Sequence, residues 1–177
     1  MINARKSIRV PGHDYTQSRA YFTTICANQH ACLFGDIVDG QMKLNRYGKI
    51  VRDEWLKTED IRPNVLLDEY VIMPNHVHGI MIVDGYVGAR RAVPLHEQFG
   101  QPVPGGIPTI IRAFKSAVTE RIRQISNMPN RTVWQRNYYE HIIRSDELNT
   151  IRQYIINNPV QWDHDVENTV HDRISRL

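Results

Sequence analysis

Residues 64–83 have the sequence "NVLLDEYVIMPNHVHGIMIV". Two apolar runs rich in β-branched residues flank a central Pro-Asn, and this pattern predicts two strands joined by a tight turn. Side chains alternate between the faces of a strand, so His76 and His78 share one face while Val77 lies on the other. Their Cα atoms are then roughly 7 Å apart, and both imidazoles can reach one metal ion or phosphate. A pair of half-exposed strand histidines without a ligand is the alternative interpretation.

Apolar periodicity on either side of this hairpin predicts the remaining elements. They are a strand at 20–27, a turn at 39–41, a helix at 45–58 capped by Asn45, a helix at 107–126, a strand within 132–144 after an aromatic and basic lead-in, and a last helix with Ser145 as N-cap and Pro159 at its end. The order β, α, β, β, α, β, α is typical of the α+β, ferredoxin-like split βαβ fold. We therefore expect a four-stranded antiparallel sheet with two helices on one face, followed by a C-terminal helix.

The length of 177 residues predicts a single domain over residues 1–177. Residues 84–106 are rich in Gly and Pro and show no sustained period, which predicts a long mobile loop. No apolar run approaches the ~20 residues of a membrane helix, and the N-terminus lacks an apolar signal core. We expect a cytoplasmic protein without membrane contacts.

The two cysteines are Cys26 and Cys32. Their spacing matches no metal-binding or redox motif, and a cytoplasmic protein keeps its thiols reduced. The sequence therefore predicts that both pack in or beside a strand.

Basic residues gather in one part of the chain. The net charge is only +3, but residues 86–144 contain nine basic and three acidic side chains. In the predicted helix at 107–126, Arg112, Lys115 and Arg123 lie beside the apolar stripe and make a basic amphipathic surface. An acidic partner such as nucleic acid is one interpretation, and a solvated helix face is the other.

The last helix carries a second candidate for the site. Tyr154 and Asn158 are four residues apart and therefore lie on one side of the helix. Taken alone, Tyr154 is typical of the edge of a core, and Asn158 is typical of a helix cap or turn. The amide oxygen of Asn158 is also a ligand for a hard cation. With His76 and His78 it would offer two nitrogens and one oxygen.

Two blocks of sequence, "MPNHVHGIMIV" and "WQRNYYEHIIRSDELNTIRQYIINNPVQW", together resemble the single-tyrosine HUH transposases, and within them the branch of REP-associated tyrosine transposases. The HUH signature is two histidines around one hydrophobic residue, matched by His76 and His78. In this branch the nucleophile stands in a Tyr-x-x-x-Asn-Pro context, matched by Tyr154. Tyr138 and Tyr139 are nearby competitors that lack the asparagine one turn later.

The resemblance implies a transposase that nicks and transfers single-stranded DNA with hairpin ends through a 5′-phosphotyrosine intermediate. It implies a Mg²⁺ or Mn²⁺ ion bound by His76, His78 and Asn158 and a location at the nucleoid, with the protein acting as a monomer or homodimer. The basic surface would then bind DNA phosphates through Arg112, Lys115, Arg123 and Arg136, and Trp134, Tyr138 and Tyr139 are candidates for base stacking.

Two other functions fit the same residues. One is a ferredoxin-like module, or a domesticated transposase relative, that binds a nucleic-acid hairpin without cutting it. The other is a metal-assisted phosphoesterase whose nucleophile is water, which predicts that Tyr154→Phe stays active.

Overall fold

The computed structural model describes residues 19–84, 105–126 and 130–168. The predicted mobile loop at 84–106 falls, apart from its ends, outside the described residues. Among the residues described, no helix is both long and apolar enough to cross a membrane.

The elements follow the predicted order, with one extra hairpin and two short 3₁₀ turns. They are β1 (Arg19–Cys26), η1 (Asn28–His30), β2 (Gly35–Val38), β3 (Gln41–Leu44), α1 (Arg46–Asp60), β4 (Val65–Ile72), β5 (His76–Val83), α2 (Ile107–Ile125), β6 (Tyr139–Ile142), α3 (Leu148–Asn157) and η2 (Trp162–His164).

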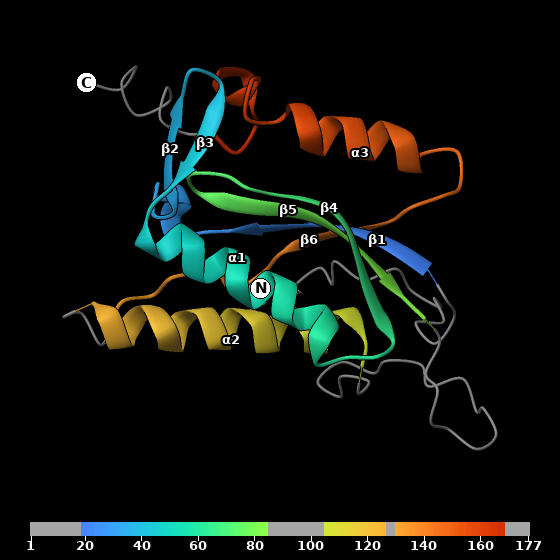
Figure 1. Cartoon of the computed structure of the whole chain (residues 1–177), viewed down its shortest axis with the longest axis horizontal. Helices are drawn as coiled ribbons and strands as arrows, with labels where there is room; N and C mark the ends of the chain where they lie inside the picture. The colour runs from blue at the N-terminus through green and yellow to red at the C-terminus, as the bar shows by residue number, and fades with distance from the viewer. Residues whose placement is uncertain (1–18, 85–104, 127–129, 169–177) are drawn as a thin grey trace, which may run out of the picture.

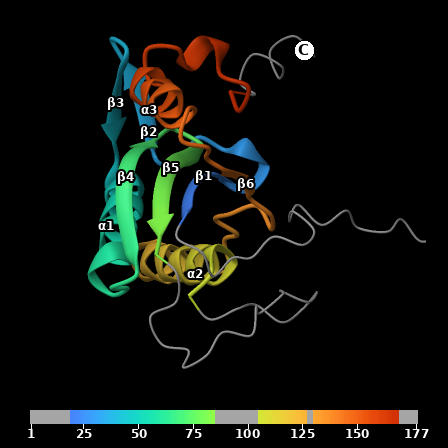
Figure 2. The ribbon, with the colours of Figure 1, turned by 90° about the vertical axis from the view of Figure 1, so that its right-hand side faces the viewer.

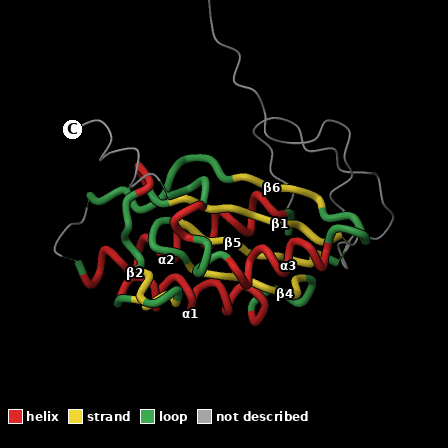
Figure 3. The backbone as a smooth tube through the Cα atoms, turned by 90° about the horizontal axis from the view of Figure 1, so that it is seen from above, coloured by secondary structure: helices red, strands yellow, loops and turns green. Residues whose placement is uncertain are grey.

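The main sheet has the strand order β4-β5-β1-β6, and each neighbouring pair is antiparallel (Figure 3). This confirms the predicted α+β sheet with split βαβ connectivity. The turn between β4 and β5 is tight, since the Met73 amide donates to the carbonyl of His76 over 2.8 Å. The register places Cys26, at the end of β1, opposite His76 at the start of β5.

Helices α1 and α2 lie side by side on one face of the sheet, and α3 crosses the other face (Figures 1 and 2). The larger core lies between the sheet and the α1–α2 layer and includes Val77 of β5. A smaller core of Ile80, Ile143 and Ile155 joins α3 to the opposite face. Gly79 is required by the larger core, because a Cβ there would come within 2.2 Å of the Trp55 ring. The sheet is therefore buried on both faces.

Helix α1 begins where the sequence predicts. The side-chain oxygen of Asn45 accepts from the amides of Tyr47 and Gly48, which satisfies two of the free N–H groups of the first turn.

Two local features differ from the predictions. The sequence predicts only a turn near 39–41, whereas the chain forms the β2–β3 hairpin, whose strands have four residues each and are too short to show a clear period. Ser145 is not the N-cap of the last helix. Helix α3 is instead preceded by Glu147, whose carboxylate accepts from the Arg144 amide over 2.9 Å and holds residues 145–147 in a turn. Strand β6 lies within the predicted range 132–144 and follows the lead-in, as the sequence predicts.

Candidate active site

The two histidines come from β5 and lie beneath α3. His76 and His78 are 0% and 2% exposed, and their ring centroids are 4.3 Å apart. Val77 lies in the core on the opposite face, as the alternation predicts. The interpretation as half-exposed strand histidines is wrong, because α3 and the segment that follows it cover this face (Figure 2). Two buried imidazoles therefore face one another at the end of a central strand.

The hydrogen bonds of Asn75 decide which nitrogen of His76 is available. The Asn75 side-chain amide donates to the carbonyls of Glu167 and His30, over 2.6 and 3.4 Å. Its oxygen is then the acceptor for the Nδ1–H of His76, 2.7 Å away. The proton of the neutral ring is fixed on Nδ1, and the Nε2 lone pair is left bare. Nε2 is buried and has no hydrogen-bond partner among the described residues, which is the state that binds a metal.

His78 is fixed between a threonine and a tyrosine. Its Nδ1 lies 2.9 Å from the hydroxyl oxygen of Thr24, and its Nε2 lies 3.2 Å from the hydroxyl of Tyr154. The ring also stacks on Phe22, with centroids 5.2 Å apart. If Nδ1–H donates to Thr24, Nε2 is the basic nitrogen and faces the phenol.

Burial keeps both rings neutral. Burial first, and then the nearby His30, lower the pKa of His76 to about 3, while the Asn158 amide partly offsets the effect. Burial also holds the pKa of His78 well below its usual range, with a further contribution from His76. Each ring therefore has one unprotonated nitrogen at neutral pH, as metal ligands require.

Tyr154 is the tyrosine that reaches the histidines. It lies on α3, and its side chain is partly accessible, with 38% exposed. Burial of the phenol, and then the carboxylates of Asp165 and Glu167, raise the pKa of Tyr154 to about 12. The competing Tyr138 instead donates its hydroxyl proton to Glu140 over 2.9 Å, and Tyr139 is 55% exposed on β6.

Asn158 ends α3 directly over the histidines. It is 1% exposed, and its side-chain nitrogen donates to Asp165. Its side-chain oxygen is buried without a hydrogen-bond partner among the described residues. A ring nitrogen of His76 and the amide oxygen of Asn158 are thus both buried without partners among the described residues, and both are ligand types for a divalent cation.

Asp165 joins this group, although no motif in the sequence points to it. His76, His78 and Asp165 can each offer one ligand atom, and the three atoms lie within 4.8 Å of one another. Two imidazoles, one amide oxygen and one carboxylate fit a divalent cation. Asp165 was missed because it belongs to no motif and reaches the site only where the chain turns back through η2 after α3. The only sequence feature that could have indicated Asp165 is that an acidic residue follows Asn158-Pro159 within a few positions.

Known proteins resemble this chain in sequence and in fold. No family model matches the chain. An uncharacterised protein of Haemophilus influenzae is 41% identical over 169 residues, which cover 93% of each chain. The chain belongs to the same family as this protein.

Among solved structures, that of a REP-associated tyrosine transposase bound to a REP hairpin has a TM-score of 0.56 and 18% identity, and the match covers 99% of this chain and 87% of the other. The chain therefore has the fold of that transposase. A candidate transposase from Deinococcus radiodurans is 20% identical with a TM-score of 0.43, over 84% of this chain and 97% of the other.

The side chains predicted to bind DNA lie on α2 and on the strap, by which we mean residues 130–138 between α2 and β6. Arg112 and Arg123 on α2 and Arg136 on the strap are exposed. Lys115 is half-buried, and its ammonium donates to the carbonyls of Gln135 and Asn137, both over 2.9 Å. Burial lowers the pKa of Lys115 to about 8. Lys115 therefore ties the strap to α2 and keeps one donor for another partner.

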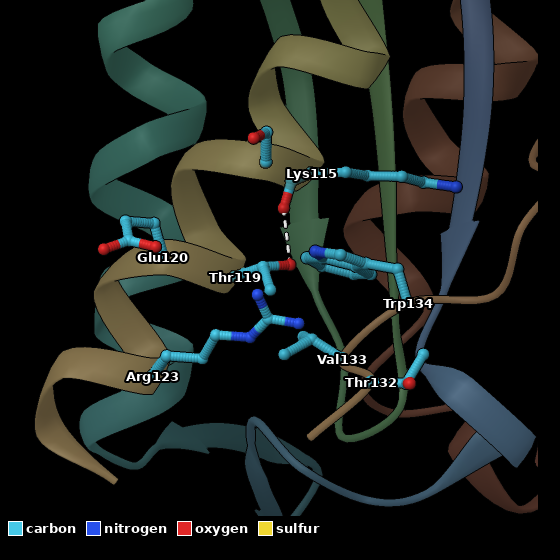
Figure 4. A pocket seen from close by; sticks show the side chains of 8 residues that line it. Lys115, Thr119, Glu120, Arg123, Thr132, Val133 and Trp134 are labelled. Atoms are coloured by element: carbon cyan, nitrogen blue, oxygen red, sulfur yellow. Dashed lines mark hydrogen bonds between the residues drawn. The ribbon is translucent and has the colours of Figure 1, made fainter. Parts of the chain in front are cut away.

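A cavity of about 330 Å³ separates α2 from the strap. Figure 4 shows Thr119 and Arg123 entering it from α2, opposite Thr132 and Trp134. The indole N–H of Trp134 is buried without a hydrogen-bond partner among the described residues. Trp134 also pairs with Ala27, next to the strand end that faces His76, so this basic cavity and the histidines lie at the same end of the sheet.

Proposed function

We propose that the protein is a metal-dependent tyrosine transposase that nicks and rejoins single-stranded DNA with hairpin ends. The observation that carries the proposal is the contact between the Tyr154 hydroxyl and His78, beside two buried ligand atoms that lack partners. A phenol next to a divalent cation is the arrangement expected for covalent phosphoryl transfer. The shared fold with a REP-associated tyrosine transposase supports the same conclusion.

The proposed ligands are His76, His78, Asn158 and Asp165. A bound Mg²⁺ or Mn²⁺ would supply Lewis-acid stabilisation of the charge that develops on the phosphoryl oxygens. Asn75 and Thr24 would hold the two rings in the tautomers that leave Nε2 free.

Tyr154 would act as the nucleophile. Its oxygen would attack the scissile phosphorus in line, so that the Tyr–O–P bond forms as the P–O3′ bond breaks. The departing oxygen takes up a proton and leaves as a 3′-OH, and the phenolic proton goes to water at the accessible side of the ring. The DNA then remains attached through a 5′-phosphotyrosine. Because this link keeps a reactive phosphodiester, a second 3′-OH can displace Tyr154 and rejoin strands without ATP.

The exposed arginines would bind the DNA backbone. Arg112, Arg123 and Arg136 would contact phosphates, which gives affinity without sequence choice. Lys115 would contribute its remaining donor while it holds the strap. The cavity beside Trp134 is a candidate position for an unpaired nucleotide. A cytoplasmic location at the nucleoid, and action as a monomer or homodimer, belong to the same proposal.

A cleavage assay tests the function. A labelled single-stranded hairpin oligonucleotide, taken from the DNA that flanks the gene, is incubated with protein and Mg²⁺, Mn²⁺ or EDTA and resolved on a denaturing gel. We expect cleavage with either metal and none in EDTA. His76→Ala should be inactive at every metal concentration, whereas the exposed His164→Ala should keep wild-type activity.

Undiminished cleavage in EDTA would show that the histidines are not metal ligands. Hairpin binding without cleavage under any condition would instead support the non-cleaving module. Full activity of Tyr154→Phe would support the phosphoesterase with a water nucleophile.

A further inference from the structure

A second group of metal-ligating side chains lies beside the candidate active site. Cys26 ends β1, His30 lies in η1, and Glu167 belongs to the segment after η2. Each can offer one ligand atom, and the three atoms lie within 4.8 Å of one another. The sequence predicts simple packing for Cys26, because its partner is 141 residues away and no spacing motif reveals it.

The distances in this group match those of a tetrahedral zinc site. One carboxylate oxygen of Glu167 lies 3.4 Å from the Cys26 sulfur and 3.3 Å from Nδ1 of His30. Bonds of about 2.0 Å from Zn²⁺ to nitrogen or oxygen and about 2.3 Å to sulfur place tetrahedral ligand atoms about 3.3–3.5 Å apart. Two of the three pairs of ligand atoms are therefore already spaced as corners of one coordination shell, and the third pair, from Cys26 to His30, lies within 4.8 Å.

One ligand atom of this group lacks a hydrogen-bond partner among the described residues. Nδ1 of His30 is buried and makes no well-aligned hydrogen bond within the described part of the chain, although Glu167 is near. The backbone holds His30 there, because Gln29 and His30 both have left-handed φ values, 55° and 49°. A bound cation would satisfy the lone pair of Nδ1 and the charge of Glu167 together.

Both backbone polar groups of Glu167 are held by hydrogen bonds. Its amide donates to the Asp165 carboxylate over 2.7 Å, and its carbonyl accepts from Asn75. Asp165 and Asn75 both belong to the candidate active site, so the two groups share one segment of chain.

We propose that Cys26, His30 and Glu167 bind a zinc ion, with water in the fourth position. A sulfur, a nitrogen and an oxygen donor together favour Zn²⁺ over Mg²⁺ or Ca²⁺, which prefer oxygen ligands alone. Binding converts the Cys26 thiol to the thiolate and releases its proton to water. The zinc ties residues 165–167 to the end of β1 and thereby fixes the Asp165 carboxylate that the active site uses. This is a positioning role and does not depend on the DNA chemistry.

Cobalt replaces zinc as the spectroscopic probe. The full-length protein, stripped of metal with a chelator, is titrated with Co²⁺ while the near-ultraviolet and visible absorption are recorded. We expect a thiolate-to-cobalt charge-transfer band that rises to saturation as Co²⁺ is added and disappears when Zn²⁺ is added. Cys26→Ser should abolish the band, and Cys32→Ser, which alters the other cysteine, should keep it. Glu167→Gln should weaken Co²⁺ binding by about tenfold or more.

The band reports this site alone, because the proposed catalytic ligands contain no sulfur. His76→Ala should keep it even if the DNA-cleavage proposal fails. A wild-type protein that shows no charge-transfer band would overturn the inference. So would a band that survives in Cys26→Ser, or one that Cys32→Ser removes. If Cys26→Ser does not fold, unchanged Co²⁺ affinity in Glu167→Gln would be sufficient to reject the site.

Discussion

At the scale of single residues, the proposed chemistry depends on two buried atoms that lack hydrogen-bond partners among the described residues. They are Nε2 of His76 and the side-chain oxygen of Asn158. Strand alternation predicts that His76 and His78 share a face, and the helical four-residue spacing predicts that Tyr154 and Asn158 share a side. Each rule depends only on the regular geometry of one strand or one helix, so the sequence alone predicts both placements. Asp165 could not be predicted, because its position depends on how the chain turns back after α3, which is a tertiary property.

Asn158→Ala tests the ligand role of the amide. We expect cleavage to fall but not vanish, and excess Mn²⁺ to restore part of it, because water can replace one neutral oxygen ligand. The measurement is cleavage rate against Mn²⁺ concentration. Asn157→Ala is the matched control, since Asn157 is exposed on the same helix turn. Equal loss in both variants, without rescue by Mn²⁺, would indicate damage to the helix end and not to a metal ligand.

At the scale of elements, the position of α3 decides whether Tyr154 reaches His78. The Arg152 guanidinium donates through two nitrogens to the Asp68 carboxylate on β4. This pair lowers the pKa of Asp68 and joins α3 to the sheet beyond the small apolar core. Periodicity predicts α3 itself, but it could not predict that Asp68, at an irregularity of β4 between Leu67 and Tyr70, would face Arg152.

Asp68→Asn should loosen α3 without unfolding the sheet. We expect a loss of about 1 kcal/mol, because Arg152 is partly exposed and the pair is screened by water. Hydrogen exchange should show faster exchange in α3 and unchanged exchange in β5, with a lower cleavage rate. Glu69→Gln, at the exposed neighbouring position, is the control. Unchanged exchange in α3 would show that the apolar contacts alone hold the helix.

The start of α3 should be sensitive to acid. The Arg144 side chain, then its backbone amide and His141, lower the pKa of Glu147 from 4.5 to about 2. A carboxylate with a depressed pKa stabilises the fold at pH values above its ordinary pKa, and this contribution is lost as the pH falls through the folded value. We expect the amides at the start of α3 to exchange faster, relative to Glu147→Gln measured at the same pH, as the pH falls from about 4.5 towards 2. A constant ratio of the two rates would contradict this role of Glu147.

At the scale of the whole molecule, the two faces of the sheet have different roles. The α1–α2 layer provides most of the core, while the α3 face carries the candidate active site (Figure 1). Element order predicts this architecture, because few topologies accommodate it. The β2–β3 hairpin and the return of the chain after α3 could not be predicted, since short strands and irregular turns leave weak patterns.

Binding to DNA should depend on salt and on strand state. We expect a preference for single-stranded hairpins over blunt duplex, with a slope of about −0.7 in log affinity against log salt for each phosphate contact. Arg123→Ala should reduce the slope by about 0.7. Arg52→Ala, on α1 next to Asp53, should leave it unchanged. Equal affinity for both substrates with no dependence on salt would exclude the proposed DNA surface.

The proposed nucleophile is tested most sharply by identifying the residue that becomes linked to DNA. Wild-type protein is incubated with Mn²⁺ and a hairpin oligonucleotide, digested with protease and nuclease, and analysed by mass spectrometry. We predict a nucleotide attached through a 5′-phosphate to the peptide that contains Tyr154, and no adduct in EDTA. Tyr154→Phe should form no adduct while it still binds the hairpin, and loss of the hydroxyl should cost at most about 1–2 kcal/mol of stability. An adduct on Tyr138 or Tyr139, or one that persists in Tyr154→Phe, would contradict the account.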